Sequence, residues 1–188
     1  MFGFFKKEIH EPIELQRQDL MVYPESLRPI ILNGEDCDKV KGAYGEFGSV
    51  NNPIPVNGAM GEIKYLGKLR GKTGNALFFH RIGSTSSCIC EHRVDIYETV
   101  CMDGTQWNTI HLDFYHPRRS NLVPPSYSLM PYDKSLGEDI PFAYGVNYPV
   151  TNFPYALPEA IQRFYGEEIG CVFARHAREK LNKSNFKR

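Results

Sequence analysis

Two runs of alternating apolar and polar residues, separated by a short turn, constrain the fold of this chain more than any other feature. Residues 93–101 read RVDIYETVC and residues 105–115 read TQWNTIHLDFY, with Met-Asp-Gly between them. Alternation with a period of two is typical of a strand with one buried face, and Asp-Gly is a common β-hairpin turn. The sequence therefore predicts an antiparallel hairpin that turns at 102–104.

The length of this turn decides which residues share a face of the hairpin. A two-residue turn pairs Ile96 with His111 and divides the apolar side chains between the two faces. A three-residue turn, with Gly104 in the left-handed conformation, pairs Ile96 with Ile110 and gathers the apolar side chains on one face. Because burial favours one continuous apolar face, we predict the three-residue turn.

Patterns on either side of the hairpin indicate a mixed fold. Residues 62–69 and 75–82 also read as strands, whereas residues 8–60 are broken by prolines and Asn-Gly turns. Residues 117–156 carry seven prolines and many aromatic residues without periodicity, and residues 157–183 have the period of one or two helices. We expect an α+β fold: a mostly antiparallel sheet in the N-terminal two-thirds, an irregular segment, and C-terminal helices packed on the sheet.

The length of the chain fits a single domain. A chain of 188 residues, of which 41% are hydrophobic, can bury one sizeable core. We divide it into a β-rich part at about 1–116, the irregular segment 117–156, a helical part 157–183 and a basic tail 184–188.

Charge and cysteine content indicate a compartment more clearly than a partner. The 22 basic and 22 acidic residues balance, so the sequence gives no strong nucleic-acid signal. Five cysteines are an odd number, which fits a reducing compartment better than a disulfide framework. No apolar run is long enough to predict a transmembrane segment. We therefore expect a soluble, cytoplasmic protein.

Cysteine and histidine residues recur at two-residue spacing ahead of the hairpin. In the predicted register Cys88, Cys90, His92 and His116 share the buried face and supply the ligand types of a zinc site. Strand residues two and four apart lie about 6.5 and 13 Å from each other, whereas zinc ligands lie within roughly 4 Å. An ideal strand offers only Cys90 and His116 to one ion. We favour buried thiols and no cofactor, with a metal-stabilised fold as the less favoured hypothesis.

The other face of the hairpin carries an acid and an imidazole that could do chemistry. In the predicted register Asp95 faces His111, and a carboxylate that orients an imidazole is an arrangement used in general-base catalysis. The sequence shows no partnered Ser or Cys nucleophile. Polar pairs are also ordinary on a solvated sheet face, so we favour a structural pair. A hydrolase-like enzyme that uses Asp95 and His111 is the alternative function.

Residues after the hairpin are the candidates for ligand binding. Arg118 and Arg119 could hold a phosphate or carboxylate with their planar guanidinium groups, although salt bridges within the chain are the favoured interpretation. Tyr144 and Tyr148 belong to an aromatic segment that could line a groove or fill the gap between sheet and helix. The two interpretations of these rings are evenly balanced.

The absence of a convincing catalytic set in the sequence favours a small binding or protein-interaction module. Its partner would be another protein or an anionic small ligand, held by the arginines and aromatic residues of 117–155. The sequence indicates neither the identity of this partner nor the oligomeric state.

Overall fold

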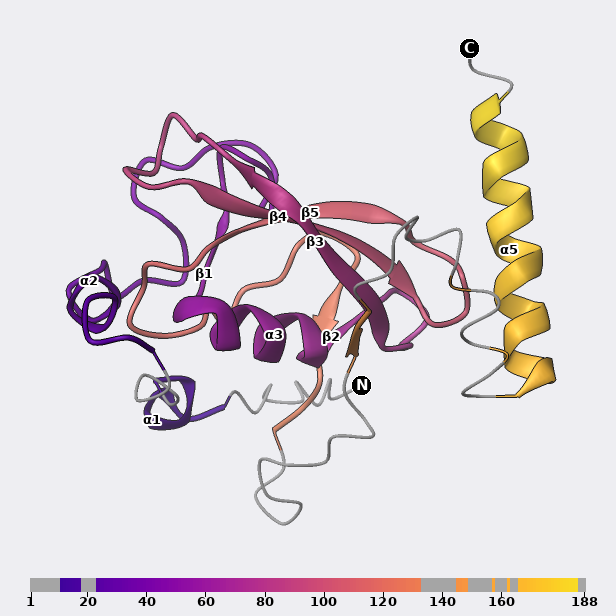
Figure 1. Cartoon of the computed structure of the whole chain (residues 1–188), viewed down its shortest axis with the longest axis horizontal. Coiled ribbons are helices and arrows are strands. Elements are labelled where there is room, and N and C mark those ends of the chain that lie inside the picture. The colour runs from indigo at the N-terminus through magenta and orange to yellow at the C-terminus, as the bar shows by residue number, and fades with distance from the viewer. Residues whose placement is uncertain are drawn as a thin grey trace, which may run out of the picture.

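The computed structural model of the chain is a mixed α+β fold built around one five-stranded sheet (Figure 1). It describes residues 11–17, 23–132, 145–148, 157, 162 and 166–185. The strand order is β1-β5-β4-β3-β7. The central strands are β3 (Leu77–Thr85), β4 (Val94–Cys101) and β5 (Asn108–Asp113), and they are antiparallel to one another.

Two short edge strands correct the prediction of a mostly antiparallel sheet. β1 (Ile54–Pro55) pairs with β5 and β7 (Val146–Asn147) pairs with β3, and both pairs are parallel. Each edge strand comes from a segment outside the β3–β5 meander, so the chain reaches it by a crossover instead of a hairpin turn. The α+β class is confirmed, but the sheet is mixed.

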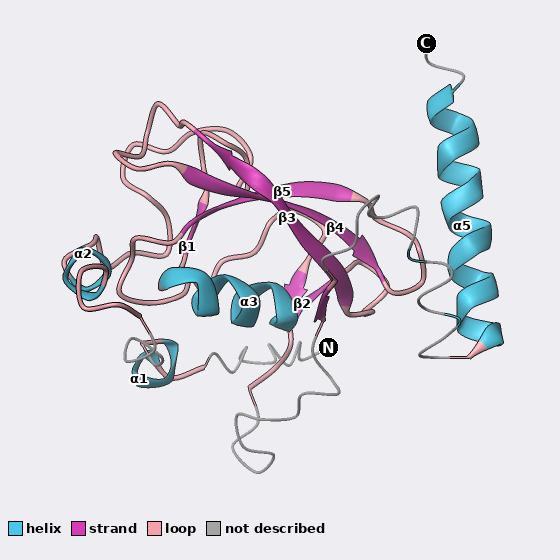
Figure 2. Cartoon of the chain, in the orientation of Figure 1, coloured by secondary structure: helices cyan, strands magenta, loops and turns pink. Residues whose placement is uncertain are grey.

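Four helices and a second small sheet complete the described structure. The helices are α1 (Ile13–Gln16), α2 (Arg28–Leu32), α3 (Gly58–Lys68) and α5 (Glu167–Asn185). Strands β2 (Leu69–Arg70) and β6 (Ser128–Leu129) form the antiparallel second sheet. Figure 2 shows α3 running along one side of the main sheet.

Helix α3 occupies most of the segment 62–69, for which the predicted strand was wrong. Glu62, Tyr65, Leu66 and Leu69 are buried, at the i, i+3, i+4 and i+7 spacing of one helical face. The glycines that lower helix propensity here have a packing role, because a Cβ at Gly61 would lie 2.4 Å from Oδ1 of Asn57. The close packing that glycine permits in α3 therefore outweighs the low helix propensity of glycine.

The hairpin of β4 and β5 forms as predicted, but its predicted register was wrong. Gly104 is left-handed, and Cys101 N–H donates to the Thr105 carbonyl, as a three-residue turn requires. The next residue, Gln106, is also left-handed with φ 51°, and beyond it Thr99 pairs with Asn108. Gln106 is thus an extra residue on one strand, and it shifts all later pairs by one. Ile96 consequently pairs with His111, and Tyr97 pairs with Ile110.

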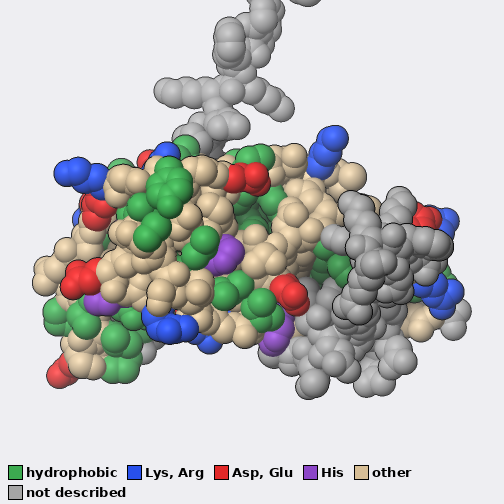
Figure 3. Space-filling view, turned by 90° about the horizontal axis from the view of Figure 1, so that it is seen from above, with side chains coloured by type: hydrophobic (Ala, Val, Ile, Leu, Met, Phe, Trp, Pro, Cys, Tyr) green, Lys and Arg blue, Asp and Glu red, His purple; other side chains and the backbone are tan. Residues whose placement is uncertain are grey.

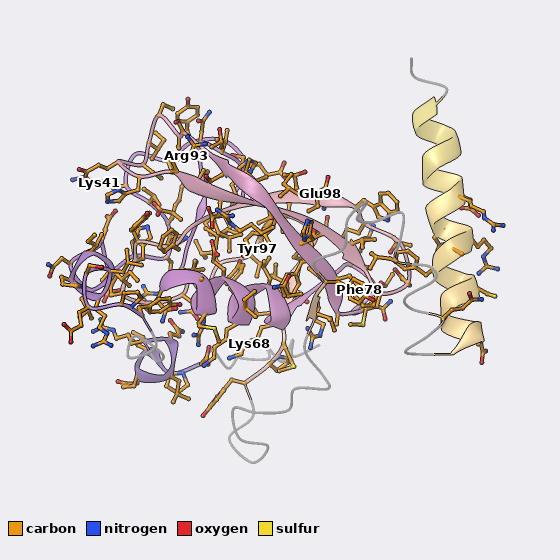
Figure 4. The ribbon with its side chains drawn as sticks, in the orientation of Figure 1. Lys41, Lys68, Phe78, Arg93, Tyr97 and Glu98 are labelled. Carbon is orange, nitrogen blue, oxygen red and sulfur yellow. The ribbon has the colours of Figure 1, made fainter. Side chains whose placement is uncertain are left out.

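This register divides the core between the two faces of the sheet. Tyr97, Ile110 and Leu112 belong to a large buried cluster with Tyr65 and Leu66 of α3. Figure 4 shows Tyr97 on the α3 side of the sheet and Glu98 on the opposite side. A smaller cluster on the second face contains Phe78, Val100, Leu157 and Phe173. Asp95 therefore lies on the α3 side, away from His111.

The prediction of a C-terminal helix is confirmed by α5, which contacts the turn between β4 and β5. The Phe173 and Phe78 rings meet edge to face with centroids 6.2 Å apart, and Nδ1 of His176 lies 2.5 Å from the Asp103 carbonyl oxygen. The predicted packing of C-terminal helices on the sheet stays a prediction. Among the described residues, no helix is both long and apolar enough to span a membrane.

Candidate functional site

Asp95, predicted as a catalytic residue, is part of a buried cluster between the sheet and α3. Both oxygens of its carboxylate accept bonds from Arg81, at 2.6 Å from Nε and 2.7 Å from Nη2. The Asp95 residue is 7% exposed, while the Arg81 side chain is 48% exposed. Arg81 therefore neutralises Asp95 from the solvent side. We call Glu62, Arg81, Asp95 and Tyr97 the carboxyl cluster.

Glu62 of α3 is the second acid of the carboxyl cluster. It is 1% exposed, Tyr97 donates its hydroxyl proton to Oε2 over 3.0 Å, and Oε1 has no hydrogen-bond partner. Burial, followed by the negative charge of Asp95, raises the pKa of Glu62 to about 9. Glu62 is consequently a neutral carboxylic acid at neutral pH, next to the carboxyl group that binds Arg81.

A second buried polar cluster forms where β5 ends. Its centre is His116, which follows the last residue of β5, Asp113, by three positions. Nε2 of His116 is in ionic contact with Oδ2 of Asp113 at 3.3 Å, and Nδ1 lies 2.7 Å from the Glu35 carbonyl oxygen. Sγ of Cys37 lies 3.8 Å from the same Nδ1. We call Cys37, Cys90, Asp113 and His116 the thiol–imidazole cluster.

The charges of the thiol–imidazole cluster follow from these contacts. Burial alone would lower the pKa of His116, but the contacts with Asp113 and Cys37 and the charge of Asp113 outweigh it and raise the pKa to about 10. Burial opposes ionisation of Asp113 as well, yet its contacts with His116 and Cys90 lower its pKa. His116 is therefore an imidazolium, with Asp113 as its counter-ion.

Cys90 approaches Asp113 from the segment before β4 and differs from Cys37 in its surroundings. Burial, the charge of Asp113 and a bond with its carboxylate raise the pKa of the Cys90 thiol to about 12. Cys90 therefore stays a neutral thiol. Cys37, which is half-buried, instead faces the positive imidazolium.

Local structure explains why Cys37 reaches His116 across such a distance in sequence. The loop that contains Cys37 lies directly against the chain after β5, because a Cβ at Gly34 would be 1.8 Å from the Tyr115 carbonyl oxygen. The backbone of His116 is fixed from the other side, since its backbone N–H donates to the Val56 carbonyl beside β1. A glycine at 34 thus permits the close approach that brings the thiol to the imidazole.

Arg118 and Arg119, predicted as ligand-binding residues, bond to groups of this chain. Arg118 donates to Asp36 at 2.5 Å and to Asp38 at 2.6 Å. Arg119 is 2% exposed and donates to the Glu11 carboxylate at 3.0 Å and to the Leu15 carbonyl at 3.2 Å. These contacts hold two N-terminal segments to the chain after β5.

The other predicted site residues lie apart from one another, and Figure 3 shows histidine side chains at separate places on one face of the molecule. Nδ1 of His111 is 3.2 Å from the Gly48 carbonyl oxygen, and the ring of Tyr148 packs edge to face on Phe78. Cys88 is exposed and contacts the Tyr44 hydroxyl, and His92 is exposed with its ring 4.0 Å from that of Tyr115. Tyr144 lies outside the described residues.

The structure brings Cys90 and His116 to the same carboxylate, but it does not assemble the predicted four-residue metal set. No group of three or more His, Cys, Asp or Glu side chains in the described part of the chain could hold a metal ion. Sequence reasoning missed Cys37 and Glu62. Cys37 stands in a loop without periodicity, whereas Glu62 could have been found from the helical spacing of its buried neighbours.

Comparison with protein-family models, curated proteins and solved structures finds no match for this chain.

Proposed function

We propose that this chain is a thiol-dependent enzyme of the hydrolase or acyl-transfer class, with Cys37 as its nucleophile. The observation that carries the proposal is the line of three groups in which Cys37 Sγ faces Nδ1 of His116, at 3.8 Å, and Asp113 faces Nε2, at 3.3 Å. A nucleophile beside an imidazole that is oriented by a third group is the recurring arrangement of covalent catalysis. Reactive cysteines are also characteristically half-exposed and next to positive charge.

Each residue of this line has a role in acyl transfer from an ester, thioester or amide. Cys37 would react as a thiolate paired with the His116 imidazolium, and its sulfur would attack the carbonyl carbon, forming a carbon–sulfur bond as the bond to the leaving group breaks. The leaving group would take the proton that Nδ1 of His116 shares with the Glu35 carbonyl. Water would then attack the thioester and give a proton to the neutral His116, and the sulfur would leave as the thiolate. Asp113 would keep the imidazole in place through both steps.

The proposed activity belongs to the hydrolase-like class that the sequence suggested as an alternative, but it uses other residues. Asp95 and His111 lie on opposite faces of the sheet, so the proposal does not use them as a pair. A binding or protein-interaction function through 117–155 stays a prediction, because Tyr144 and most of 133–156 lie outside the described residues.

We infer a reducing compartment such as the cytoplasm for this activity. All five cysteines are free, and a nucleophilic thiol must stay reduced. The opposite inference would follow if the purified protein from its native source carried disulfides.

The experiment uses an activated ester, p-nitrophenyl acetate, with the whole chain. We expect a burst of p-nitrophenolate and an acetyl group on Cys37 in the mass spectrum of the digested protein. The Cys37→Ala variant should lose the burst and the adduct. Cys171→Ala is the matched control, because Cys171 is an exposed free thiol on α5, and it should retain both.

Two results would overturn the proposal. One is a burst of unchanged size in Cys37→Ala. The other is an acetyl group distributed over Cys88 and Cys171 as much as over Cys37, since that is the labelling of ordinary exposed thiols.

A further inference from the structure

Cys37 stands between two carboxylates that bind one guanidinium group. Nε of Arg118 donates to Oδ1 of Asp36 at 2.5 Å, and Nη1 donates to Oδ1 of Asp38 at 2.6 Å. The two aspartates are the immediate neighbours of Cys37 in the sequence. Arg118 therefore holds the chain on both sides of the thiol.

Asp38 is fixed further by the residues that follow Arg118. Ser120 donates its hydroxyl proton to the Asp38 carbonyl over 2.7 Å, and Asn121 N–H donates to the Asp38 carboxylate over 2.8 Å. His116, the partner of the thiol, is two residues before Arg118. One short segment, 116–121, thus carries both the imidazole and the groups that hold Cys37 beside it.

The strength of this arrangement comes from burial and from the shape of the guanidinium group. The Arg118 side chain is only 9% exposed while Asp36 and Asp38 are 42% and 39% exposed, so these ion pairs are screened less than pairs in which both partners are on the surface. A guanidinium is planar with donors in fixed directions, and it can therefore fix two acceptors relative to each other. The loop from 33 to 40 contains no helix or strand, so its position depends on such side-chain bonds.

We propose that Arg118 is a positioning residue that sets the separation of Cys37 Sγ and His116 Nδ1. This inference rests on the proposed function, because it concerns the reactivity of the same thiol. A misplacement of about 1 Å between reacting groups can cost about 100-fold in rate. Arg118 acts on Cys37 only through Asp36 and Asp38.

Arg17 provides a matched control for Arg118. It also forms an ion pair with Asp36, but its side chain is 50% exposed and it does not bond to Asp38 in the described residues. Replacing Arg17 removes a positive charge of the same kind from the same carboxylate. Of the two arginines, Arg118 alone bonds to both aspartates beside the thiol.

The test measures alkylation of Cys37 by iodoacetamide as a function of pH, with the modified residue identified by mass spectrometry. We expect Arg118→Gln to slow the labelling of Cys37 about tenfold or more and to change the shape of its pH profile, whereas Arg17→Gln changes the rate less than about twofold. Arg118→Lys should recover part of the rate, because a point charge can hold one aspartate but not both.

A second variant distinguishes a change in the fold from a change in the position of Cys37. Asp38→Asn keeps a side chain of the same size and weakens one of the two ion pairs, and it should slow Cys37 labelling in a protein with an unchanged circular dichroism spectrum. The inference is overturned if a folded Arg118→Gln or Asp38→Asn variant labels at the wild-type rate with the wild-type pH profile. Failure of the proposed function would be visible earlier, as wild-type Cys37 labelling no faster than Cys171.

Discussion

The carboxyl cluster and the thiol–imidazole cluster both contain buried ionisable side chains, but the protonation states of these side chains differ. In the first, two acids meet in the core and one of them, Glu62, retains its proton. In the second, an acid meets a base, and Asp113 and His116 both carry charge. Like charges in a low-dielectric interior are avoided by protonation, whereas opposite charges there can persist as a pair.

The two clusters also differ in what supports them. The carboxyl cluster is built from α3, β3 and β4, so regular structure fixes its side chains. The thiol–imidazole cluster takes its residues from the end of β5 and from two loops that ion pairs and close backbone contacts hold together. Functional residues are often found on loops carried by a rigid scaffold, and the second cluster has that character. Replacing one residue of each cluster tests this difference.

The largest effect is expected for His116→Ala. This change leaves the Asp113 carboxylate buried without its cation, which typically costs about 3–5 kcal/mol of unfolding free energy. Urea unfolding at pH 7 measures the loss. His92→Ala is the control, because His92 is exposed and contacts only the ring of Tyr115 among the described interactions, and it should cost less than about 1 kcal/mol. A loss below about 1 kcal/mol in His116→Ala would mean that no buried ion pair exists.

The next effect is a pH dependence that belongs to Glu62. Its pKa is raised from 4.5 to about 9, so the folded state binds a proton that the unfolded state has lost. Stability from this proton is complete below about pH 4.5 and is lost as pH rises toward 9, by at most about 1.4 kcal/mol per pH unit. Unfolding measured between pH 5.5 and 6.5 isolates Glu62, because His116 contributes a similar fall only above about pH 6.5.

Glu62→Gln is the variant that tests this assignment. A glutamine has a similar shape and no proton to lose, so the fall in stability between pH 5.5 and 6.5 should disappear. Asp113 and Glu11 do not interfere in this range, since their pKa values are lowered and their contributions are complete above about pH 5. An unchanged slope in Glu62→Gln would assign the titration to another group.

The strands of the sheet could be predicted from the sequence because alternation reports burial directly. Residues 94–101 and 108–113 form the predicted hairpin, and 77–82 lie within β3. The register could not be predicted in the same way. It depends on a single left-handed residue, Gln106, whose side chain bonds to Lys72 N–H and to the Ser126 carbonyl, far away in the sequence. Tertiary contacts thus decided which face each side chain occupies.

The thiol–imidazole cluster could be predicted only in part. Cys90 and His116 were recognised as residue types that bind or react, but Cys37 precedes His116 by 79 positions and no local pattern connects them. The sequence around it, Glu-Asp-Cys-Asp-Lys, does place acids on both sides of a cysteine, and Arg118 supplies the opposite charge. Charge complementarity is a weak signal without a fold, because many aspartates could pair with one arginine.

An intermediate effect is expected when the cation of the carboxyl cluster is removed. Arg81→Gln removes the guanidinium group that donates to both oxygens of Asp95, and bonds to a charged group typically contribute about 1.5–3 kcal/mol. Because the Arg81 side chain is 48% exposed, solvent screens part of this, and we expect a loss of about 1–2 kcal/mol in urea unfolding. Arg93→Gln is the control, since exposed Arg93 bonds to Ser84 alone among the described residues, and an equal loss there would contradict the assignment.

The smallest effect, about 1 kcal/mol, is expected for Tyr97→Phe, which removes the hydroxyl that donates a hydrogen bond to Glu62. The tyrosine hydroxyl favours the ionised form of Glu62, and its loss should therefore raise the pKa of Glu62 further. Carbon-13 NMR of the labelled Glu62 carboxyl measures this shift directly, with Tyr44→Phe as the exposed control. Titration at a lower pH in Tyr97→Phe would show that the hydroxyl stabilises the proton instead. In that case a hydrogen bond, and not only burial beside the negative charge of Asp95, would hold the proton of the carboxyl cluster.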